Sequence, residues 1–281
     1  MQACLRVAAR LLDAFVKRAT RWQRRLESRL VKAETSPFMG TQSPPGPREW
    51  DRLYSAEVPA VQGLSSVVAR ALQACTQEGD LLLEAGCGSG SLSAELAHAG
   101  RRVELADFSS NILSRACQLF VRSGLVEPEV HQFDMTRPWP LSDQQVDTVW
   151  SSGVLEHWTD EELLPIVREM ARVSRKSVVA LVPYAGSALY RFGKWHAETR
   201  NVWPYGRELP RATLRPLFEQ AGLTQIHEQV LWAPQSAWFL HYIDPDLSRL
   251  AGEWLHSLPA DDPILAGQGY LLLIEGKVSS V

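Results

Sequence analysis

The feature that most constrains this chain is a short apolar run that ends in a glycine-rich turn. Residues 81–85 read Leu-Leu-Leu-Glu-Ala, and Gly86, Gly88 and Gly90 follow at alternate positions. Such a run is typical of a buried strand, and glycine lets the backbone turn tightly and approach a ligand closely. A helical pattern covers residues 91–99, so the N–H groups at the start of that helix would face the ligand. The pattern therefore predicts a strand, a ligand-binding loop and a helix.

The spacing of the glycines argues against two common nucleotide-binding motifs. A dinucleotide fingerprint has the form G-x-G-x-x-G, and counted from Gly86 its last glycine would fall at Ser91. A P-loop ends in Lys followed by Ser or Thr, and no such pair follows this loop. The spacing therefore disfavours NAD and FAD as ligands, and the loop is not a P-loop.

Strand and helix patterns alternate along the rest of the chain. Strands are expected at residues 80–84, 102–107, 129–133, 146–150, 177–182, 223–231 and 270–278. Helices are expected at residues 48–76, 91–99, 109–123, 160–173 and 211–221. This alternation predicts an α/β protein with a doubly wound, mostly parallel sheet of about seven strands.

On these residues the chain resembles the class I S-adenosylmethionine-dependent methyltransferases, over residues 48–183 and more loosely to residue 278. The resemblance implies a Rossmann-like methyltransferase fold, methyltransferase activity and S-adenosyl-L-methionine as cofactor. Residues 84–90 look like the first motif of the family. That motif implies cofactor contacts for Gly86, Gly88 and Gly90, and it brings Glu84 close to the amino-acid end of the ligand.

The same resemblance assigns residues at three further strand ends. Asp107 matches the family's ribose-binding acid, since a carboxylate can accept hydrogen bonds from both ribose hydroxyls. Asp134 would take the adenine amino group, while Met135 or Phe108 packs on the adenine ring. The end of the fourth strand, at Ser151, would face the transferable methyl group.

One histidine follows the fourth strand and is the candidate catalytic residue. Residues 151–158 resemble the V-L-E-H segment of methyltransferases that act on quinone precursors and other small molecules, which brings His157 near the methyl donor. An imidazole can remove a proton from a hydroxyl acceptor near neutral pH. The imidazole can equally serve to orient the loop. The methyl donor is already activated, so the reaction needs mainly correct alignment of donor and acceptor and does not require a base. Both roles stay open, and the expected acceptor is a small or lipid-linked molecule, methylated at oxygen rather than nitrogen or carbon.

A metal-dependent variant of this segment is disfavoured. Some related O-methyltransferases, including enzymes that act on small RNAs, bind a metal through E-x-x-E-H, but this chain has Gly153 at the first Glu position. That change removes a hard oxygen ligand for Mg²⁺. A site made of Glu156, His157 and His196 is the remaining alternative, and no metal is expected.

The connection over residues 184–210 is long and rich in aromatic side chains. Connections between a strand and a helix usually have about 2–6 residues, and long insertions at strand ends commonly form substrate walls. The segment is therefore predicted to be an aromatic lid over the acceptor, unless it is a helical cap with an ordinary buried core. A second aromatic stretch at residues 232–242 could close the same pocket.

The first 34 residues differ in charge from the rest of the chain, and the net charge of the whole chain is −3. Residues 1–34 hold nine Lys or Arg against three Asp or Glu, with apolar residues on one face of a predicted amphipathic helix. This basic helix could bind an anionic membrane, dock on its own domain or a partner protein, or serve as a transit peptide. Residues 35–47 read as a Pro-rich linker, and residues 48–281 as the methyltransferase domain.

Composition points to a cytoplasmic protein, with membrane association through the basic helix left open. The four cysteines form no C-x-x-C pair, which fits a reducing compartment. The acidic main domain disfavours nucleic acid as a partner. Two alternatives to a small-molecule enzyme remain: an RNA methyltransferase whose basic helix holds phosphates, and a non-catalytic protein that binds S-adenosylmethionine or acts as a scaffold.

Overall fold

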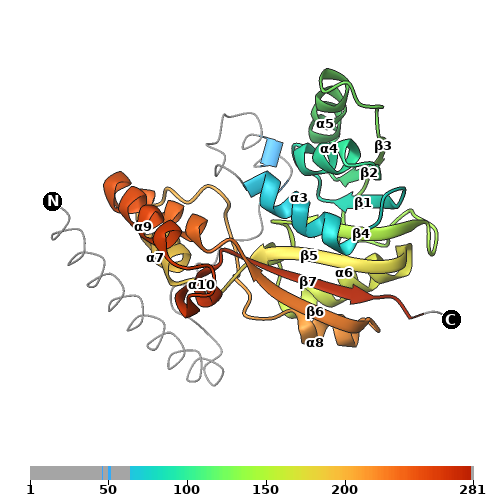
Figure 1. Cartoon of the computed structure of the whole chain (residues 1–281). Coiled ribbons are helices and arrows are strands. Elements are labelled where there is room, and N and C mark those ends of the chain that lie inside the picture. The colour runs from blue at the N-terminus through green and yellow to red at the C-terminus, as the bar shows by residue number, and fades with distance from the viewer. Residues whose placement is uncertain (1–45, 47–49, 52–63, 280–281) are drawn as a thin grey trace. The chain divides into compact units, whose positions relative to one another are not determined.

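The computed structural model describes residues 46, 50, 51 and 64–279, and these fall into two compact units (Figure 1). The sheet unit comprises the described residues of 44–182, 213–229 and 273–281. The helical unit comprises residues 183–212 and 230–272. The predicted basic helix, most of the predicted linker and the first part of the predicted helix 48–76 lie outside the described residues.

The sheet has seven strands in the order β3-β2-β1-β4-β5-β7-β6. The strands are β1 (Leu81–Ala85), β2 (Arg102–Asp107), β3 (Glu129–Gln132), β4 (Val146–Ser152), β5 (Ser174–Pro183), β6 (Thr224–Leu231) and β7 (Leu271–Lys277). Each predicted strand is present, with its bounds shifted by a few residues at most. The order reverses between β1 and β4, which is the point where open α/β sheets bind their ligands.

Strand direction makes the sheet mixed. The pairs β1–β2, β1–β4, β2–β3 and β4–β5 are parallel. The strand β7 runs against β5, since the N–H of Tyr184 donates to the carbonyl of Tyr270 (2.7 Å) and the N–H of Val278 donates to the carbonyl of Lys176 (2.9 Å). The prediction of a doubly wound, mostly parallel sheet is therefore confirmed, with β7 as the antiparallel strand.

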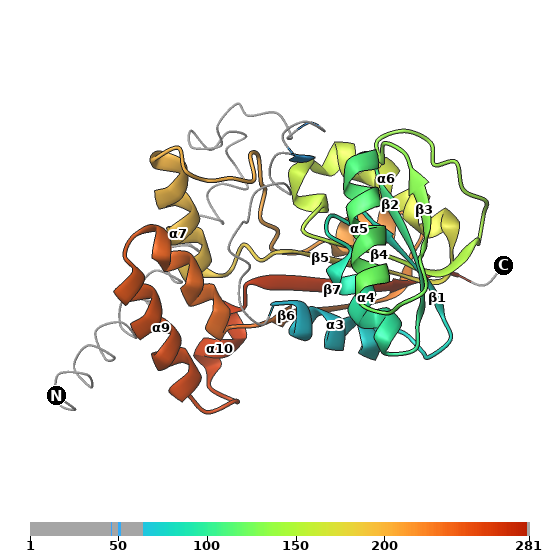
Figure 2. The ribbon, with the colours of Figure 1, turned by 90° about the horizontal axis from the view of Figure 1, so that it is seen from above.

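Helices cover both faces of the sheet (Figure 2). On one face α3 (Leu64–Cys75) packs on α4 (Ser91–His98), which packs on α5 (Ser110–Arg122). On the other face α6 (Asp160–Val173) packs on α8 (Arg215–Gln220). No helix among the described residues is both long and apolar enough to cross a bilayer.

Local sequence signals explain where the helices α5 and α6 begin. Ser109 caps α5, with its hydroxyl accepting from the N–H of Ile112 (3.2 Å). Thr159 and Glu162 form a capping box at the start of α6. The apolar face of α5 then buries Ile112, Leu113, Ala116 and Phe120 in a core cluster with Leu105 of β2. This packing fixes the segment that follows the strand end at Asp107.

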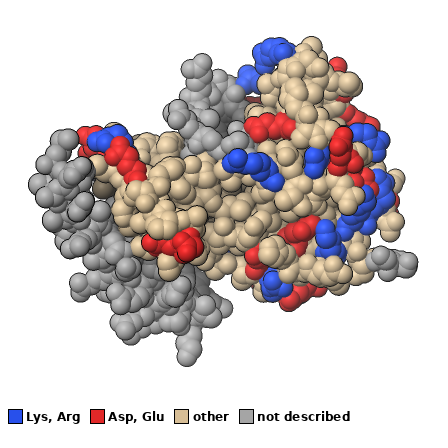
Figure 3. Space-filling view, in the orientation of Figure 1, with Lys and Arg blue, Asp and Glu red and all other residues tan. Residues whose placement is uncertain are grey.

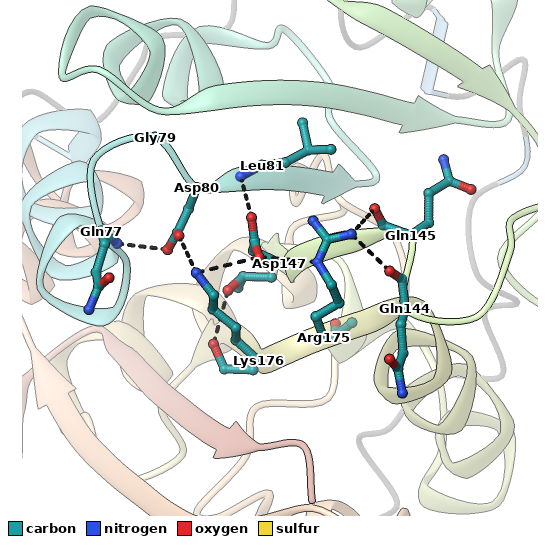
Figure 4. Close-up of polar contacts among 12 residues, drawn as sticks. Gln77, Gly79, Asp80, Leu81, Gln144, Gln145, Asp147, Arg175 and Lys176 are labelled. Atoms are coloured by element: carbon teal, nitrogen blue, oxygen red, sulfur yellow. Dashed lines mark hydrogen bonds and ion pairs between the residues drawn. The ribbon is translucent and has the colours of Figure 1, made fainter. Parts of the chain in front are cut away.

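An ion-pair network closes the amino ends of the strands β1, β4 and β5 (Figure 4). Lys176 Nζ contacts Asp80 Oδ1 at 2.6 Å and Asp147 Oδ1 at 3.4 Å. Arg175 Nε donates to the Oδ1 atom of Asp147 (3.2 Å), and the N–H of Leu81 donates to its Oδ2 atom (2.9 Å). Two carboxylates and two cations therefore hold the starts of three neighbouring strands together.

The helical unit contains elements outside the predicted helices, and one of them lies in residues 184–210, for which a helical cap was the alternative. They are α7 (Ala188–Thr199), the 3-10 helix η2 (Pro234–Tyr242), α9 (Pro245–Ser257) and α10 (Pro263–Gln268). Their shared core contains Leu189, Leu240 and Leu255 among other apolar side chains.

Many aromatic side chains predicted to form a lid lie inside this helical unit. The Tyr190 ring is fully buried, and its centroid lies 4.8 Å from that of Phe239 and 5.1 Å from that of Tyr270. The Tyr190 hydroxyl donates to the carboxyl of Glu208. Burial raises the pKa of Glu208 to about 7, against the lowering effect of Lys194 and of the tyrosine hydrogen bond. The lid role over an acceptor stays a prediction.

Candidate active site

The glycine loop is fixed to the neighbouring strand by its own backbone. The N–H groups of Gly86 and Cys87 both donate to the carbonyl of Ala106, at 2.8 and 3.0 Å. Gly86 has a φ of 76°, and a Cβ atom there would lie 2.7 Å from Cγ2 of Val154. Gly90 has a φ of 70°, and a Cβ there would lie 2.9 Å from Cβ of Ala116. Both left-handed backbone and close packing therefore require glycine at Gly86 and Gly90.

A cavity of about 270 Å³ lies at the carboxyl ends of β1, β2 and β4, within the sheet unit. Seven of the residues predicted for the site line it: Gly86, Gly88, Asp107, Phe108, Asp134, Met135 and His157. The lining also includes residues that sequence reasoning did not assign to the site: Gly46, Trp50, Ile112, Thr136, Gly153, Val154 and Trp158. The predicted donor residues and the predicted catalytic histidine thus share one cavity.

Asp107 is a buried acid whose hydrogen-bond partners on the loop and on α5 are backbone N–H groups. Ser109 N donates to its Oδ1 atom (3.0 Å), and Gly88 N donates to its Oδ2 atom (3.4 Å). Burial raises the pKa of Asp107, although the N–H groups of Ser109, Gly88 and Phe108 act in the opposite direction. Each carboxylate oxygen can accept more than one hydrogen bond, so both keep acceptor capacity for a ligand in the cavity.

Asp134 offers a second acceptor at the cavity, beside an apolar surface. Its Oδ1 atom accepts from the N–H (2.9 Å) and the hydroxyl (2.7 Å) of Thr136. Its Oδ2 atom accepts no hydrogen bond from the described residues. Met135 is buried and Phe108 is half-buried, and both line the cavity. An acceptor next to apolar side chains suits a heteroaromatic ring that carries an amino group.

Three other predicted site residues lie behind the lining. Glu84 accepts a hydrogen bond from Ser93 Oγ of α4 (2.6 Å), and burial raises the pKa of Glu84 to about 8. Gly90 packs against α5 at the start of α4. Ser151 is fully buried, and its hydroxyl has no partner among the described residues. Cofactor contact by these three residues stays a prediction.

His157 is buried in the 3-10 helix η1 (Leu155–His157), between two indole rings. Its ring centroid lies 5.1 Å from that of Trp50, at an interplanar angle of 74°. The Trp158 ring lies 6.4 Å away at 83°. Both contacts are edge-to-face arrangements, which aromatic rings prefer. The surrounding rings therefore hold the imidazole in a defined position at the cavity.

No group of three or more His, Cys, Asp or Glu side chains in the described part of the chain is arranged to hold a metal ion. Gly153 occupies the position where the metal-dependent motif has Glu, and a Cβ at this glycine would lie 3.6 Å from Glu156 Oε1. The Glu156 side chain is buried directly beside this turn.

These residues fit S-adenosylmethionine on the chemistry of their donors and acceptors. Asp107 suits a vicinal diol, Asp134 suits an exocyclic amino group, and Met135 and Phe108 suit a flat base between them. Gly86 and Gly88 present backbone without side chains to the cavity. A strand end, a glycine turn and an acid at the next strand end form the arrangement that the resemblance to the class I methyltransferases predicts.

Comparison with known proteins agrees with this class. Residues 82–177 match the family model described as a methyltransferase domain. No curated protein matches the chain. Residues 82–177 are therefore a methyltransferase domain, and the predictions of a methyltransferase, of a Rossmann-like fold and of S-adenosylmethionine as cofactor are confirmed.

Solved structures of low sequence identity share the fold. The magnesium protoporphyrin IX methyltransferase of Synechocystis, solved with S-adenosylhomocysteine, is 19% identical with a TM-score of 0.51, and the match covers 83% of this chain and 93% of that one. The geranyl diphosphate C-methyltransferase of Streptomyces coelicolor is 16% identical with a TM-score of 0.53, and the match covers 76% of each chain.

Proposed function

We propose that this protein transfers the methyl group of S-adenosylmethionine to a hydroxyl of a small molecule. The observation that carries the proposal is that His157 shares one cavity with Asp107 and Asp134. When bound, the cofactor supplies an electrophilic methyl group on a sulfonium. The protein then needs to bind the donor, align the acceptor and remove a proton.

The donor side of the cavity is made of the loop and the ends of β2 and β3. Asp107 would accept from the ribose hydroxyls, and Asp134 would accept from the adenine amino group through Oδ2. The backbone of Gly86 and Gly88 lies along the same wall. Phe108 and Met135 would cover the base. These contacts would hold the donor in one orientation. Correct orientation of donor and acceptor accounts for most of the rate increase that proximity gives.

The acceptor side would contain His157. Its imidazole is the titratable side chain on the part of the lining formed by residues 153–158. A neutral imidazole can take the proton of a hydroxyl as the new carbon–oxygen bond forms. The rings of Trp50 and Trp158 hold it in place. A base at this position favours oxygen as the acceptor atom.

A small-molecule acceptor agrees with the charge of the sheet unit. The cavity lining contains no Lys or Arg among the described residues. On the face shown in Figure 3, acidic and basic side chains are interspersed over the sheet unit without a broad basic surface. The solved relatives act on a porphyrin and on geranyl diphosphate, as their names state. A lipid-linked acceptor and a membrane contact through residues 1–34 belong to the same proposal.

The test is a methylation screen with labelled S-adenosylmethionine and the full chain. Panels of phenols and aliphatic alcohols are compared with matched amines and thiols, and products are identified by mass spectrometry. We expect labelled methyl ethers, formed by the wild-type protein and lost in His157→Ala. Transfer to amines alone would refute the oxygen assignment, and transfer to RNA alone would refute the small-molecule assignment.

A further inference from the structure

One wall of the cavity comes from a segment far from the methyltransferase motifs in sequence. Trp50 lines the cavity, and its ring meets the edge of His157. The same indole packs against the core cluster that includes Cys87 and Ile112. The ring is therefore held between the core behind the glycine loop and the candidate catalytic histidine.

Asp51 holds this segment to the start of α5. Its Oδ1 atom accepts a hydrogen bond from the Ser109 hydroxyl, and its Oδ2 atom accepts from Nδ2 of Asn111 (3.2 Å). The N–H of Ser109 donates to Asp107 Oδ1 (3.0 Å). Ser109 thus connects the ribose-binding carboxylate on one side with the carboxylate of Asp51 on the other.

The residues that line the cavity around His157 limit which acceptor molecules can bind there. The lining on the His157 side consists of Gly46, Trp50, Gly153, Val154, His157 and Trp158. None of these described residues carries a carboxylate or a fixed positive charge. An anionic group buried there would lose its hydration without an opposite charge among these residues, and the carboxylate nearest to a cation would be that of Glu156, which lies behind Gly153 and does not itself line the cavity. Aromatic faces, in contrast, gain contact area and stacking from another flat ring.

We propose that the acceptor is a flat, uncharged ring system that carries the hydroxyl, with Trp50 as the residue that selects it. Asp51 is a positioning residue that keeps Trp50 at the cavity through Ser109 and Asn111. The inference rests on the proposed methyl transfer and names its substrate class. An ammonium compound is the competing ligand, because cations also bind indole faces.

The test uses 2-naphthol as a flat neutral probe and 2-naphthylmethylammonium as its cationic counterpart. Each is titrated by calorimetry into the full chain saturated with S-adenosylhomocysteine. We expect 2-naphthol to bind, and the ammonium compound to bind at least about tenfold more weakly, a difference of about 1.4 kcal/mol. Trp50→Ala should weaken 2-naphthol binding at least about tenfold, since it removes one of the two indoles on this side of the lining. It should change S-adenosylhomocysteine affinity by less than about threefold.

Variants of Asp51 separate positioning from general stability. Asp51→Ala should weaken 2-naphthol binding, and Asp51→Asn should restore most of it, because its carbonyl oxygen can still accept from Ser109. Ser110→Ala is the matched control at the next residue, which is exposed, and it should leave both affinities unchanged.

The outcomes distinguish the two proposals. Failure of the wild-type protein to bind S-adenosylhomocysteine would overturn the proposed function. If the protein binds S-adenosylhomocysteine, the inference is overturned by absence of 2-naphthol binding, by tighter binding of the ammonium probe, or by a Trp50→Ala variant that binds 2-naphthol normally. Equal loss of both ligands in Trp50→Ala, together with a lower melting temperature, would show a structural role and would also overturn it.

Discussion

The two edges of the sheet handle buried acids in opposite ways. At the amino edge, Asp147 lies within 3.4 Å of Lys176 and 3.2 Å of Arg175. At the carboxyl edge, Asp107 accepts hydrogen bonds from the backbone N–H groups of Gly88 and Ser109. Burial alone would raise the pKa of Asp147, but Arg175, the N–H of Leu81 and Lys176 hold it below its ordinary value. Burial raises the pKa of Asp107. The first edge pairs its acid with two cations, and the second leaves its acid beside a cavity.

The direction of each pKa shift gives its consequence for pH. The pKa of Asp147 is lower in the folded protein than its value of about 3.9 in the unfolded chain. Its contribution to stability is therefore complete above about pH 3.9 and is lost as pH falls through its pKa in the folded state. The raised pKa of Asp107 means that its ionised form destabilises the folded protein. Its contribution to the free energy of unfolding therefore falls as pH rises through its pKa in the folded state. Donor binding should show the reverse trend and weaken as pH falls through the pKa of Asp107.

The largest effect on the carboxyl edge should come from His157→Ala. Loss of a general base reduces turnover by roughly 10²–10⁴-fold, while S-adenosylhomocysteine affinity changes by less than about threefold. The measurement is the rate of labelled methyl transfer to the acceptor found in the screen, beside calorimetry. His157→Gln separates the two open roles, since an amide can orient the loop but cannot act as the base. Unchanged turnover in His157→Ala would refute any role in the reaction.

Gly86→Ala should disturb the same edge through shape rather than charge. Left-handed backbone costs a non-glycine residue about 1–2 kcal/mol, and the new Cβ would collide with Val154. We expect a loss of about 2–3 kcal/mol of stability and weaker donor binding, measured by urea unfolding and calorimetry. Gly124→Ala is the matched control, since it has a φ of 71° but open space around its Cβ position. Equal losses in the two variants would mean that contact with Val154 is unimportant.

Asp147→Ala tests the amino edge. It removes the acceptor of the Leu81 N–H and a partner of Arg175 and Lys176, so we expect a loss of about 1–2 kcal/mol in the free energy of unfolding at neutral pH. The difference from wild type should close below about pH 4. Asp246→Ala, at an exposed ion pair with Arg249, should change stability by less than about 0.5 kcal/mol. Weaker donor binding in Asp147→Ala would break the division between the two edges.

Glu84→Gln should give the smallest change and show whether this acid serves structure or ligand. The pKa of Glu84 is raised to about 8 by burial, so the folded protein binds more protons than the unfolded chain between roughly pH 4.5 and 8. Stability therefore falls as pH rises across that range. Gln keeps an acceptor for Ser93 without a charge, so the melting temperature at pH 8 should rise by a few degrees with donor affinity unchanged. Weaker donor binding would instead favour the predicted contact of Glu84 with the ligand.

Much of the cavity lining near the glycine loop could be predicted because its signals are local in sequence. Asp107 and Asp134 each follow a strand pattern, and parallel strands bring their carboxyl ends to one edge. The glycine spacing indicated the backbone turn. The orientation of Glu84 toward Ser93 could not be predicted, because which face of β1 meets α4 depends on packing.

The acceptor side was less predictable because its partners are distant in sequence. No local pattern connects Trp50 with His157, and Asp51 meets Ser109 only in the folded chain. The helical unit was anticipated only as a helical cap, the alternative reading of residues 184–210. The segment of η2 has no helical periodicity, whereas α9 repeats apolar residues at helical spacing, as in Leu247, Ala251 and Leu255. Usable signals were nevertheless present at Asp244-Pro245 and Asp262-Pro263, where Asp caps a helix whose first residue is Pro.

The most direct test of the account compares two acids at the two edges of one sheet. S-adenosylhomocysteine is titrated by calorimetry into the wild-type chain, Asp107→Ala and Asp147→Ala at pH 7. We expect the wild-type chain and Asp147→Ala to bind with affinities within about threefold of each other. We expect no detectable binding by Asp107→Ala, which loses both predicted ribose acceptors. Unchanged affinity in Asp107→Ala, with the variant folded, would contradict the placement of the donor at the carboxyl edge.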